Sequence, residues 1–461
     1  MTLAQDIAPP VLAGPPIPDK PLPLFRALKA IKDNQWAAIP RAAYEEPVYL
    51  SKSILGTGYF INDPAGIKRV LLDEVANYPK APMERAALSA AFGDGILVSE
   101  GEKWRSHRRI MAPAFDFKSL VSYAPAMVEC SRDAADAWDA KGRGTVIDIA
   151  REMTHLTLDI ISRTMFSTDA ARLGGIVDDA LRRGQEMLSF DWTYLLPLIG
   201  RRRMDRQFAR IRRTFGEMDG AMRGLIRARA GGGGGTRDLL DRLVAARDSE
   251  TGGGMSEDEI RDEVVIIYLA GHETTALAMT YVWYLLSQHP AVEAKLHAEL
   301  DDVLAGRPPA HDDIARLPYT KMVIEEAMRL YPPAPGLSGR LALEADEIAG
   351  TKIPKGAMVV IAPWIVQRHR KLWDQPERYD PERFSPERSA GRHRFAYMPF
   401  GGGPRICIGM ALAMTEAVLI LATMAQRYCP RLVAGQDIVL QHRVTMRPRD
   451  GIKMILAPRK T

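Results

Sequence analysis

One apolar run constrains the fold of this chain more than any other feature. It covers residues 260–288, and Ser256 with Glu259 forms a capping-box pattern with an acidic first turn just before it. Thirty residues at about 1.5 Å each span roughly 45 Å. From Val264 to Leu286 the run is apolar almost all round, which predicts burial on most faces of one helix. Such a helix requires a large domain around it.

Helical periodicity dominates most of the remaining chain, and short β-type segments interrupt it. We therefore predict a mainly α fold with small β-sheets, of the α+β class and without repeated βαβ units. Residues 1–40 are expected to form a Pro-rich N-terminal arm that is extended and poorly packed up to Pro23, and residues 41–461 a single domain. The further helices are expected at residues 64–72, 102–112, 119–140, 147–166, 172–187, 200–229, 237–246, 291–305, 319–330 and 410–428, and a small β-rich subdomain at residues 45–62, 339–363 and 433–458.

The composition excludes several classes of protein. The chain has 461 residues, 46% apolar and 26% charged, with a formal net charge of +5, which does not indicate a nucleic-acid partner. Three widely spaced cysteines, Cys130, Cys407 and Cys429, do not form a disulfide framework and suit a reducing compartment. The N-terminus lacks a signal-peptide pattern, and no apolar run is long enough for a membrane span. A cytoplasmic location is expected.

One of the cysteines stands in a glycine-rich loop. The sequence Phe-Gly-Gly-Gly-Pro-Arg-Ile-Cys-Ile-Gly covers residues 400–409 and places Cys407 two residues after Arg405, just before an apolar helix pattern. Backbone N–H groups and the following helix N-terminus would stabilise a thiolate here as a metal ligand. The glycines leave room for a flat group against the backbone. By itself, the loop is equally compatible with a tight turn around a buried cysteine.

The long helix contains a polar interruption, Ala-Gly-His-Glu-Thr-Thr, at residues 270–275. Gly271 weakens a helix by about 1 kcal/mol relative to Ala, and a buried Glu273 needs a partner. Thr274 can donate a hydrogen bond to the carbonyl one turn earlier and distort the helix. The pattern predicts a groove for a small ligand beside a proton relay. A satisfied polar kink is the alternative.

Two other pairs carry opposite or complementary side chains at helical spacing. Glu326 and Arg329 stand at i, i+3, and Arg383 could complete a charged cluster that stabilises the fold. Trp104 and Arg108 stand at i, i+4, so an indole N–H and a guanidinium share one helix face and could hold a carboxylate. Each pair alone also fits an ordinary surface: a weak ion pair in the first case, a basic helix face in the second.

Together, in this order, these elements resemble the cytochrome P450 family of heme-thiolate monooxygenases, over residues 40–456. The resemblance implies the family's fold, with the long central helix crossing a buried heme b. It implies that Cys407 is the thiolate ligand of the iron, which favours O–O cleavage. It also implies that Glu273 and Thr274 deliver protons to bound oxygen, while Ala270 and Gly271 face the heme and leave room for O₂.

The resemblance assigns three further groups of residues. The heme-binding set is Cys407, Trp104, Arg108, Arg340, Arg405, His107, Ala270, Gly271 and Phe400, of which Trp104 and the arginines hold the propionates and His107 is an additional candidate. The structural triad is Glu326, Arg329 and Arg383. The substrate pocket is formed by Leu97, Ala270, Thr274, Ala334, Leu337 and Thr445, and it suits a hydrophobic substrate.

The implied function is insertion of one oxygen atom from O₂ into a hydrophobic organic molecule, most often as hydroxylation, with a fatty acid, an alkane or a terpenoid as substrate. The chain leaves no room for a fused electron donor, so a separate ferredoxin or flavodoxin with its reductase is expected. A basic patch would attract that partner through Lys103, Arg105, Arg109, Arg392 and Arg394. The resemblance implies a soluble, bacterial-type member. A peroxide-driven peroxygenase and a non-catalytic heme sensor or binding protein are the alternatives.

Overall fold

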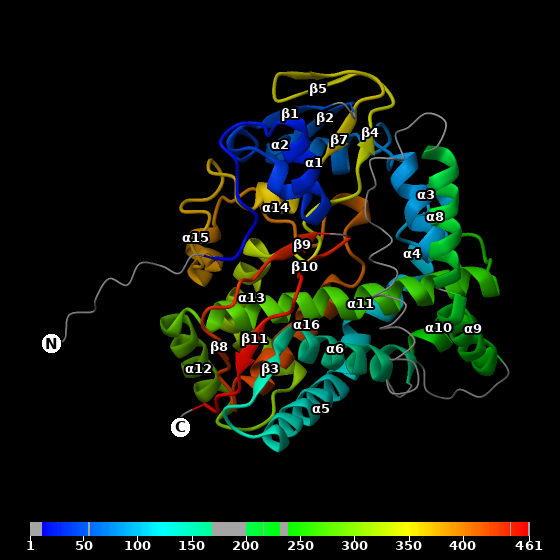
Figure 1. The fold of residues 1–461 in the computed structure, drawn as a ribbon. Helices are drawn as coiled ribbons and strands as arrows, with labels where there is room; N and C mark the ends of the chain where they lie inside the picture. Colours follow the sequence, from blue (N-terminus) through cyan, green and yellow to red (C-terminus); the bar gives the residue numbers. More distant parts are fainter. Residues whose placement is uncertain are drawn as a thin grey trace.

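The predicted long helix crosses the middle of the molecule (Figure 1). The computed structural model describes residues 12–53, 56–167, 200–214, 216–230, 238–442 and 444–459. Helix α11, Glu257–Leu286, begins with the predicted capping box: Glu259 N–H donates to Ser256 Oγ at 3.3 Å, and Ser256 N–H donates to Glu259 Oε2 at 2.9 Å. Most of α11 from Ile260 onward is buried, as its apolar pattern predicts.

The remaining helices surround α11, and α5, α6 and α16 lie along one side of it (Figure 1). The contact between α11 and α6 is close because Gly271 has no side chain: an added Cβ would lie 2.7 Å from Ile161 Cδ1. Thr157 Oγ1 of α6 donates to the His272 carbonyl of α11 at 2.9 Å. The other described α-helices are α1 Leu24–Asp33, α2 Pro64–Lys68, α3 Pro82–Phe92, α4 Gly101–Met111, α5 Phe117–Lys141, α6 Ile149–Phe166, α8 Gly200–Thr214, α9 Gly216–Ala230, α10 Leu239–Ala245, α12 Pro290–Leu304, α13 Pro318–Leu330, α14 Pro363–Val366, α15 Pro386–Ser389 and α16 Met410–Met424.

Short helices of other types connect these elements. The 3₁₀-helices are η1 Gln35–Ala38, η2 Arg41–Tyr44, η4 Ala112–Phe115, η6 His311–Arg316, η7 Pro381–Phe384, η8 Arg394–Ala396 and η9 Gly403–Arg405, and η3 Arg69–Asp73 is a π-helix. Among the described helices, none is both long enough and apolar enough to cross a membrane.

The β-structure is confined to small sheets, as predicted. A four-stranded sheet has the order β1-β2-β7-β4, in which β2 and β7 are parallel and the other neighbours antiparallel. The strands are β1 Val48–Ser53, β2 Gly56–Ile61, β3 Val146–Asp148, β4 Arg340–Leu341, β5 Asp346–Ile348, β6 Thr351–Ile353, β7 Met358–Val360, β8 Arg431–Leu432, β9 Leu440–His442, β10 Met446–Pro448 and β11 Lys453–Ile455. The smaller sheets are β3-β11-β8, β9-β10 and β5-β6.

Some element boundaries differ from those predicted. Residues 147 and 148, expected to open a helix, pair with β11 within strand β3, and α6 begins only at Ile149. Helices α8 and α9 occupy the range 200–229 where a helix is expected, on either side of residue 215, which lies outside the described residues. Helix α3 was not predicted. It begins with Pro82 at its first position, where a missing N–H costs nothing. The helix expected at residues 172–187 lies outside the described residues.

The expected extended arm is wrong for residues 12–40. This segment contains α1 and η1, and it is hydrogen-bonded to the helical body. Ala13 N–H donates to Tyr284 Oη at 3.0 Å, and Tyr331 Oη donates to the Ala13 carbonyl at 2.8 Å. Trp36 is buried with 2% of its surface exposed. Most of the prolines that suggested an arm lie within this segment, and they do not prevent it from packing on the helical body.

Candidate active site

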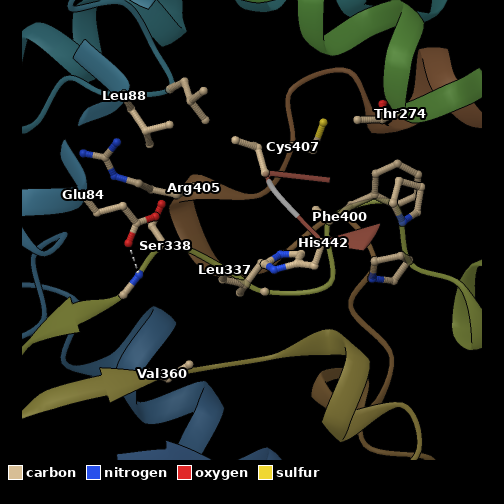
Figure 2. A pocket seen from close by; sticks show the side chains of 18 of the residues that line it. Glu84, Leu88, Thr274, Leu337, Ser338, Val360, Phe400, Arg405, Cys407 and His442 are labelled. Carbon is tan, nitrogen blue, oxygen red and sulfur yellow. Dashed lines mark hydrogen bonds between the residues drawn. The ribbon is translucent and has the colours of Figure 1, made fainter. Parts of the chain in front are cut away.

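A large internal cavity lies between α11 and the cysteine loop, with a volume of about 1580 Å³. Ligand pockets in proteins usually measure roughly 300–1,000 Å³, so this cavity has room for a large cofactor together with a substrate. Its wall includes Cys407, the α11 residues Ala270, Gly271 and Thr274, and many apolar side chains. Figure 2 shows Arg405 and Glu84 at one end of the pocket, and Phe400 and Thr274 toward the other.

The cysteine loop holds Cys407 at the cavity wall by backbone contacts. The Cys407 N–H donates to the Phe400 carbonyl at 2.9 Å. Gly403 has φ +68°, and a Cβ there would collide with the Leu71 carbonyl oxygen, so only glycine fits. Cys407 is the exposed cysteine of the three, and its exposed surface faces this cavity. Burial raises the pKa of its thiol, and a hydrogen bond from the Gly409 backbone and the charge of Arg108 act in the opposite direction.

Cationic side chains gather at one end of the cavity. Arg405 lies 4.3 Å over the centre of the Trp104 ring, and Arg108 Nη1 donates to the Ile406 carbonyl at 2.9 Å. Arg340 Nε and Arg405 Nη1 are buried and have no hydrogen-bond partner. Buried guanidinium N–H groups without acceptors are costly, so this end of the cavity is suited to bind anions. The four residues come from α4, β4 and η9, and the predicted clamp is therefore assembled in one place.

Lys80 lies at the same end and was missed by the sequence analysis. Its Nζ donates to the Leu97 carbonyl, and it lines the cavity. Burial, together with the charge of Arg405, lowers its pKa to about 7. An anion placed among these cations would raise it again. Lys80 forms a β-bridge with Arg340, and no local motif in the sequence marks it.

His107 is a correction to the predicted clamp. It is buried with its Nδ1 2.6 Å from Glu263 Oε1 and its Nε2 3.4 Å from Glu259 Oε1, both on α11. It does not line the cavity. The helix face that carries Trp104 and Arg108 points toward the cavity, but residue 107 points away from it. His107 therefore connects α4 to α11.

The polar segment of α11 divides between the cavity and the protein interior. Thr274 lines the cavity, and its Oγ1 donates to the Ala270 carbonyl at 2.8 Å. Glu273 is not part of the wall: its Oε1 accepts a hydrogen bond from Thr445 Oγ1 at 2.7 Å. Thr445 is also absent from the cavity wall, so its prediction as a pocket residue is wrong. Its neighbour Val444 does line the wall. Of the predicted pocket residues, Leu97, Ala270, Thr274, Ala334 and Leu337 do line the cavity.

Glu416 of α16 is another cavity residue that the sequence analysis missed. Its carboxyl is buried, and Oε1 has no hydrogen-bond partner. Burial raises its pKa well above the usual range, and a hydrogen bond with Thr275 only partly offsets this. Burial therefore favours the protonated form of Glu416. A single carboxylate in the otherwise apolar run from Met410 to Met424 was the signal that could have found it.

The charged triad forms behind the cysteine loop. Arg329 donates to both carboxylate oxygens of Glu326, at 2.6 and 2.8 Å, and Arg383 Nε lies 3.3 Å from Glu326 Oε1. All three side chains are buried. Arg329 also donates to the Gln367 carbonyl at 2.8 Å, and Gln367 Oε1 accepts the Met398 N–H at 3.0 Å. The triad is thereby connected to the segment that leads into the cysteine loop.

The arrangement fits a heme group. The glycine-rich loop presents one cysteine sulfur, and the large cavity opens in front of it. At one end, Arg405 pairs with Glu100, but Arg405 Nη1 and Arg340 Nε still lack acceptors of the kind that propionates would supply. Cys407 would hold the iron, and Trp104, Arg108, Arg340, Arg405 and Lys80 would bind the propionates. Phe400 and Gly271 also line the cavity.

Comparisons with known proteins agree with this site. The family model for cytochrome P450 matches residues 15–455. Cyclooctatin synthase from Streptomyces melanosporofaciens is 37% identical over 408 residues, covering 86% of this chain and 83% of that protein. Cyclooctat-9-en-7-ol 5-monooxygenase from the same species is 36% identical over 75% of this chain and 74% of its own length. Pentalenene oxygenase from Streptomyces avermitilis is 36% identical over 75% of this chain and 76% of its own length.

Solved structures agree as well. The crystal structure of the cytochrome P450DA heme domain superimposes with a TM-score of 0.78 at 27% identity and covers 90% of both chains. The cytochrome P450 CYP102L1 gives a TM-score of 0.78 at 27% identity and covers 90% of this chain and 92% of its own. The chain belongs to the cytochrome P450 family and is a cytochrome P450 monooxygenase.

Proposed function

We propose that this monooxygenase hydroxylates a terpenoid, with heme b as cofactor and with electrons from a separate protein. The observation that carries the proposal is the cavity in front of Cys407, whose wall is mostly Leu, Ile, Ala, Phe, Met and Pro side chains. Such a wall binds a substrate by burial and shape. Two relatives at 36% identity are named cyclooctat-9-en-7-ol 5-monooxygenase and pentalenene oxygenase. Both names denote oxidation of a terpenoid, which supports this class over fatty acids and alkanes.

Each part of the wall has a separate task in this proposal. Cys407 ligates the iron, and the cationic end holds the propionates so that the cofactor keeps one orientation. When bound, the heme activates O₂, and a thiolate ligand favours cleavage of the O–O bond. The apolar side chains exclude water from the reacting atoms and hold the substrate over the iron. Ala270 and Gly271, with their small side chains, leave the space along α11 that O₂ requires.

Proton supply is assigned to residues of α11 and α16. The Thr274 hydroxyl faces the cavity and can accept or donate a hydrogen bond there. Glu273 is held toward Thr445, so it would act through a change of side-chain rotamer or through water. Glu416 lines the same cavity, and burial raises its pKa and so favours its protonated form. The proposal therefore assigns a direct role to Thr274 and gives Glu273 an indirect one.

The electron donor is proposed to be a ferredoxin or flavodoxin with its reductase, but the expected basic patch does not support an acidic partner strongly. Lys103 Nζ lies 3.2 Å from Asp94, and Arg109 Nη2 lies 2.9 Å from Asp248. Arg105 pairs with Glu102. Arg392 lies over the ring of Trp373 and Arg394 over that of Phe395. The carboxylates compensate the charges of Lys103, Arg105 and Arg109, whereas the ring contacts leave Arg392 and Arg394 with their charges. The cytoplasmic location stays a prediction.

An optical titration of the purified ferric protein tests the proposal. Terpenoids, fatty acids, alkanes and aromatic compounds are added in turn, and a saturable shift of the main heme band reports a ligand that displaces iron-bound water. Product formation is then measured with a ferredoxin–reductase system and, separately, with hydrogen peroxide. A shift and a hydroxylated product with terpenoids alone are expected. A response confined to another class would refute the terpenoid assignment, and efficient turnover with peroxide alone would favour a peroxygenase.

A further inference from the structure

Helix α8 carries a row of arginines on its outer face. The row consists of four exposed side chains at a spacing of three or four residues, which places them on one side of the helix: Arg202, Arg206, Arg210 and Arg213. It is roughly 16 Å long, because each helical residue adds about 1.5 Å. The other side of the helix carries Phe208 and Ile211, which pack into the apolar core. The row therefore faces away from the protein.

The charges of this arginine row are not compensated within the described part of the chain. None of its four side chains forms an ion pair or a hydrogen bond with another described residue. The next helix, α9, is different, because Arg223, Arg227 and Arg229 each pair with a carboxylate. The sequence of α8 holds seven arginines and a single acid, Asp205. The charge of the row is thus available to an anionic partner outside the protein.

The surface of α8 favours a lipid partner over a protein partner. Interfaces between proteins usually have a core of apolar or aromatic side chains inside a polar rim. Among the described side chains of α8, none is a large exposed hydrophobic group. An anionic lipid surface requires no such core, because each basic residue close to it raises the affinity about fivefold through the negative surface potential. A straight row of arginines also fits a flat surface without any matching shape.

The arginine row lies close to the active-site cavity. Helix α8 packs against α3 (Figure 1), and α3 contributes Met83, Ala87 and Leu88 to the cavity wall. No described residue of α8 lines the cavity itself, so the row is one helix away from the wall. A bilayer bound to the row would therefore lie on the α3 side of the cavity.

We propose that the arginine row of α8 binds the anionic headgroups of a lipid bilayer and holds the protein reversibly at a membrane surface. This inference goes beyond the proposed function, and the row takes no part in the oxygenation itself. Because the apolar side of α8 is already packed against the protein, the contact is electrostatic and added salt weakens it. A hydrophobic substrate dissolved in the bilayer would then be concentrated next to the enzyme.

The test measures co-sedimentation of the heme-loaded protein with lipid vesicles. One set contains phosphatidylcholine alone, and the other contains phosphatidylcholine with anionic phosphatidylglycerol. Binding is expected with the second set only, and it should decrease as salt is added. The double variant Arg206→Gln and Arg210→Gln should bind roughly 30-fold more weakly, since each arginine contributes about fivefold. Replacing the same two residues by Lys keeps their charge and should preserve binding.

A matched control separates the row from the total charge of the protein. Arg132→Gln with Arg151→Gln removes the same charge from exposed arginines of α5 and α6, and it should bind like the wild type. The heme spectrum and Tm of every variant are measured to confirm that it is folded. Failure to bind phosphatidylglycerol vesicles, equal binding to both vesicle sets, or the same affinity in the α8 variant and the control would refute the proposal. The optical titration with terpenoids tests the proposed function separately.

Discussion

The two sides of the cavity are built in different ways. The cysteine loop is one continuous segment whose backbone fixes Cys407, with Gly403 at φ +68° against Leu71 and the triad connected through Gln367. The opposite side collects residues from η1, α3, α11 and the strands β4 and β9. One side therefore presents a fixed chemical group, and the other a surface whose shape depends on segments far apart in the chain. Substitutions on the first side should consequently remove the iron ligand or weaken the loop that holds it, and those on the second should change how bound oxygen and substrate are used.

The largest effect is expected for Cys407→Ser. A serine hydroxyl is not ionised at neutral pH and does not replace a thiolate, so essentially all activity should be lost. The absorption of the reduced carbon monoxide complex reports the ligand directly. Cys429→Ser, a change at a buried cysteine outside the cavity, should keep the wild-type spectrum. An unchanged thiolate spectrum in Cys407→Ser would show that another residue holds the iron.

The next effect should come from the triad that supports the same loop. Glu326→Gln leaves Arg329 and Arg383 buried without their anion, which should lower the free energy of unfolding by roughly 3–5 kcal/mol. Chemical denaturation and heme content measure it. Glu344→Gln removes the exposed pair with Lys355 and should change stability by less than about 1 kcal/mol. Equal effects of both changes would contradict a structural role for the triad.

On the other side of the cavity, Thr274→Ala should separate electron use from product. General acid catalysis commonly contributes about 10²- to 10⁴-fold, so product per electron should fall by at least roughly tenfold. Electron consumption and product are measured together. Thr280→Ala is the matched control, since Thr280 also donates to the carbonyl four residues earlier but is buried away from the cavity. Unchanged coupling in Thr274→Ala would overturn its role in proton supply.

The smallest effect concerns the contact between α4 and α11. Burial lowers the pKa of His107, but the hydrogen bond and charge of Glu263, with Glu259, outweigh this and raise it overall. Because the pKa of His107 is higher in the folded than in the unfolded chain, its protonation stabilises the fold. This stabilisation is complete below the ordinary pKa near 6.5 and is lost as the pH rises through the pKa of the folded chain. This contribution should make the folded chain more stable at pH 6 than at pH 8, by about 1 kcal/mol for each pH unit by which folding raises the pKa of His107. His107→Gln should abolish this component of the Tm profile. An identical pH profile in the variant would contradict it.

The features that the sequence alone determined are those carried by short, continuous segments. The capping box and apolar run predicted α11, and the residues 400–409 predicted the cysteine loop, because backbone geometry and side-chain spacing act within one element. Spacing within one helix placed Trp104 and Arg108 on the same face, whereas only the family resemblance joined the distant Arg405 to them.

What only the tertiary structure decided depends on packing between distant segments. The orientation of His107 toward Glu263, of Glu273 toward Thr445 and of Lys80 into the clamp depends on how segments far apart in the chain pack against one another. Residues 12–40 show the same limit: their prolines indicated an arm, but burial of Trp36 and hydrogen bonds to Ala13 hold the segment on the domain. A helical period specifies which residues share a face, whereas tertiary packing decides what that face meets.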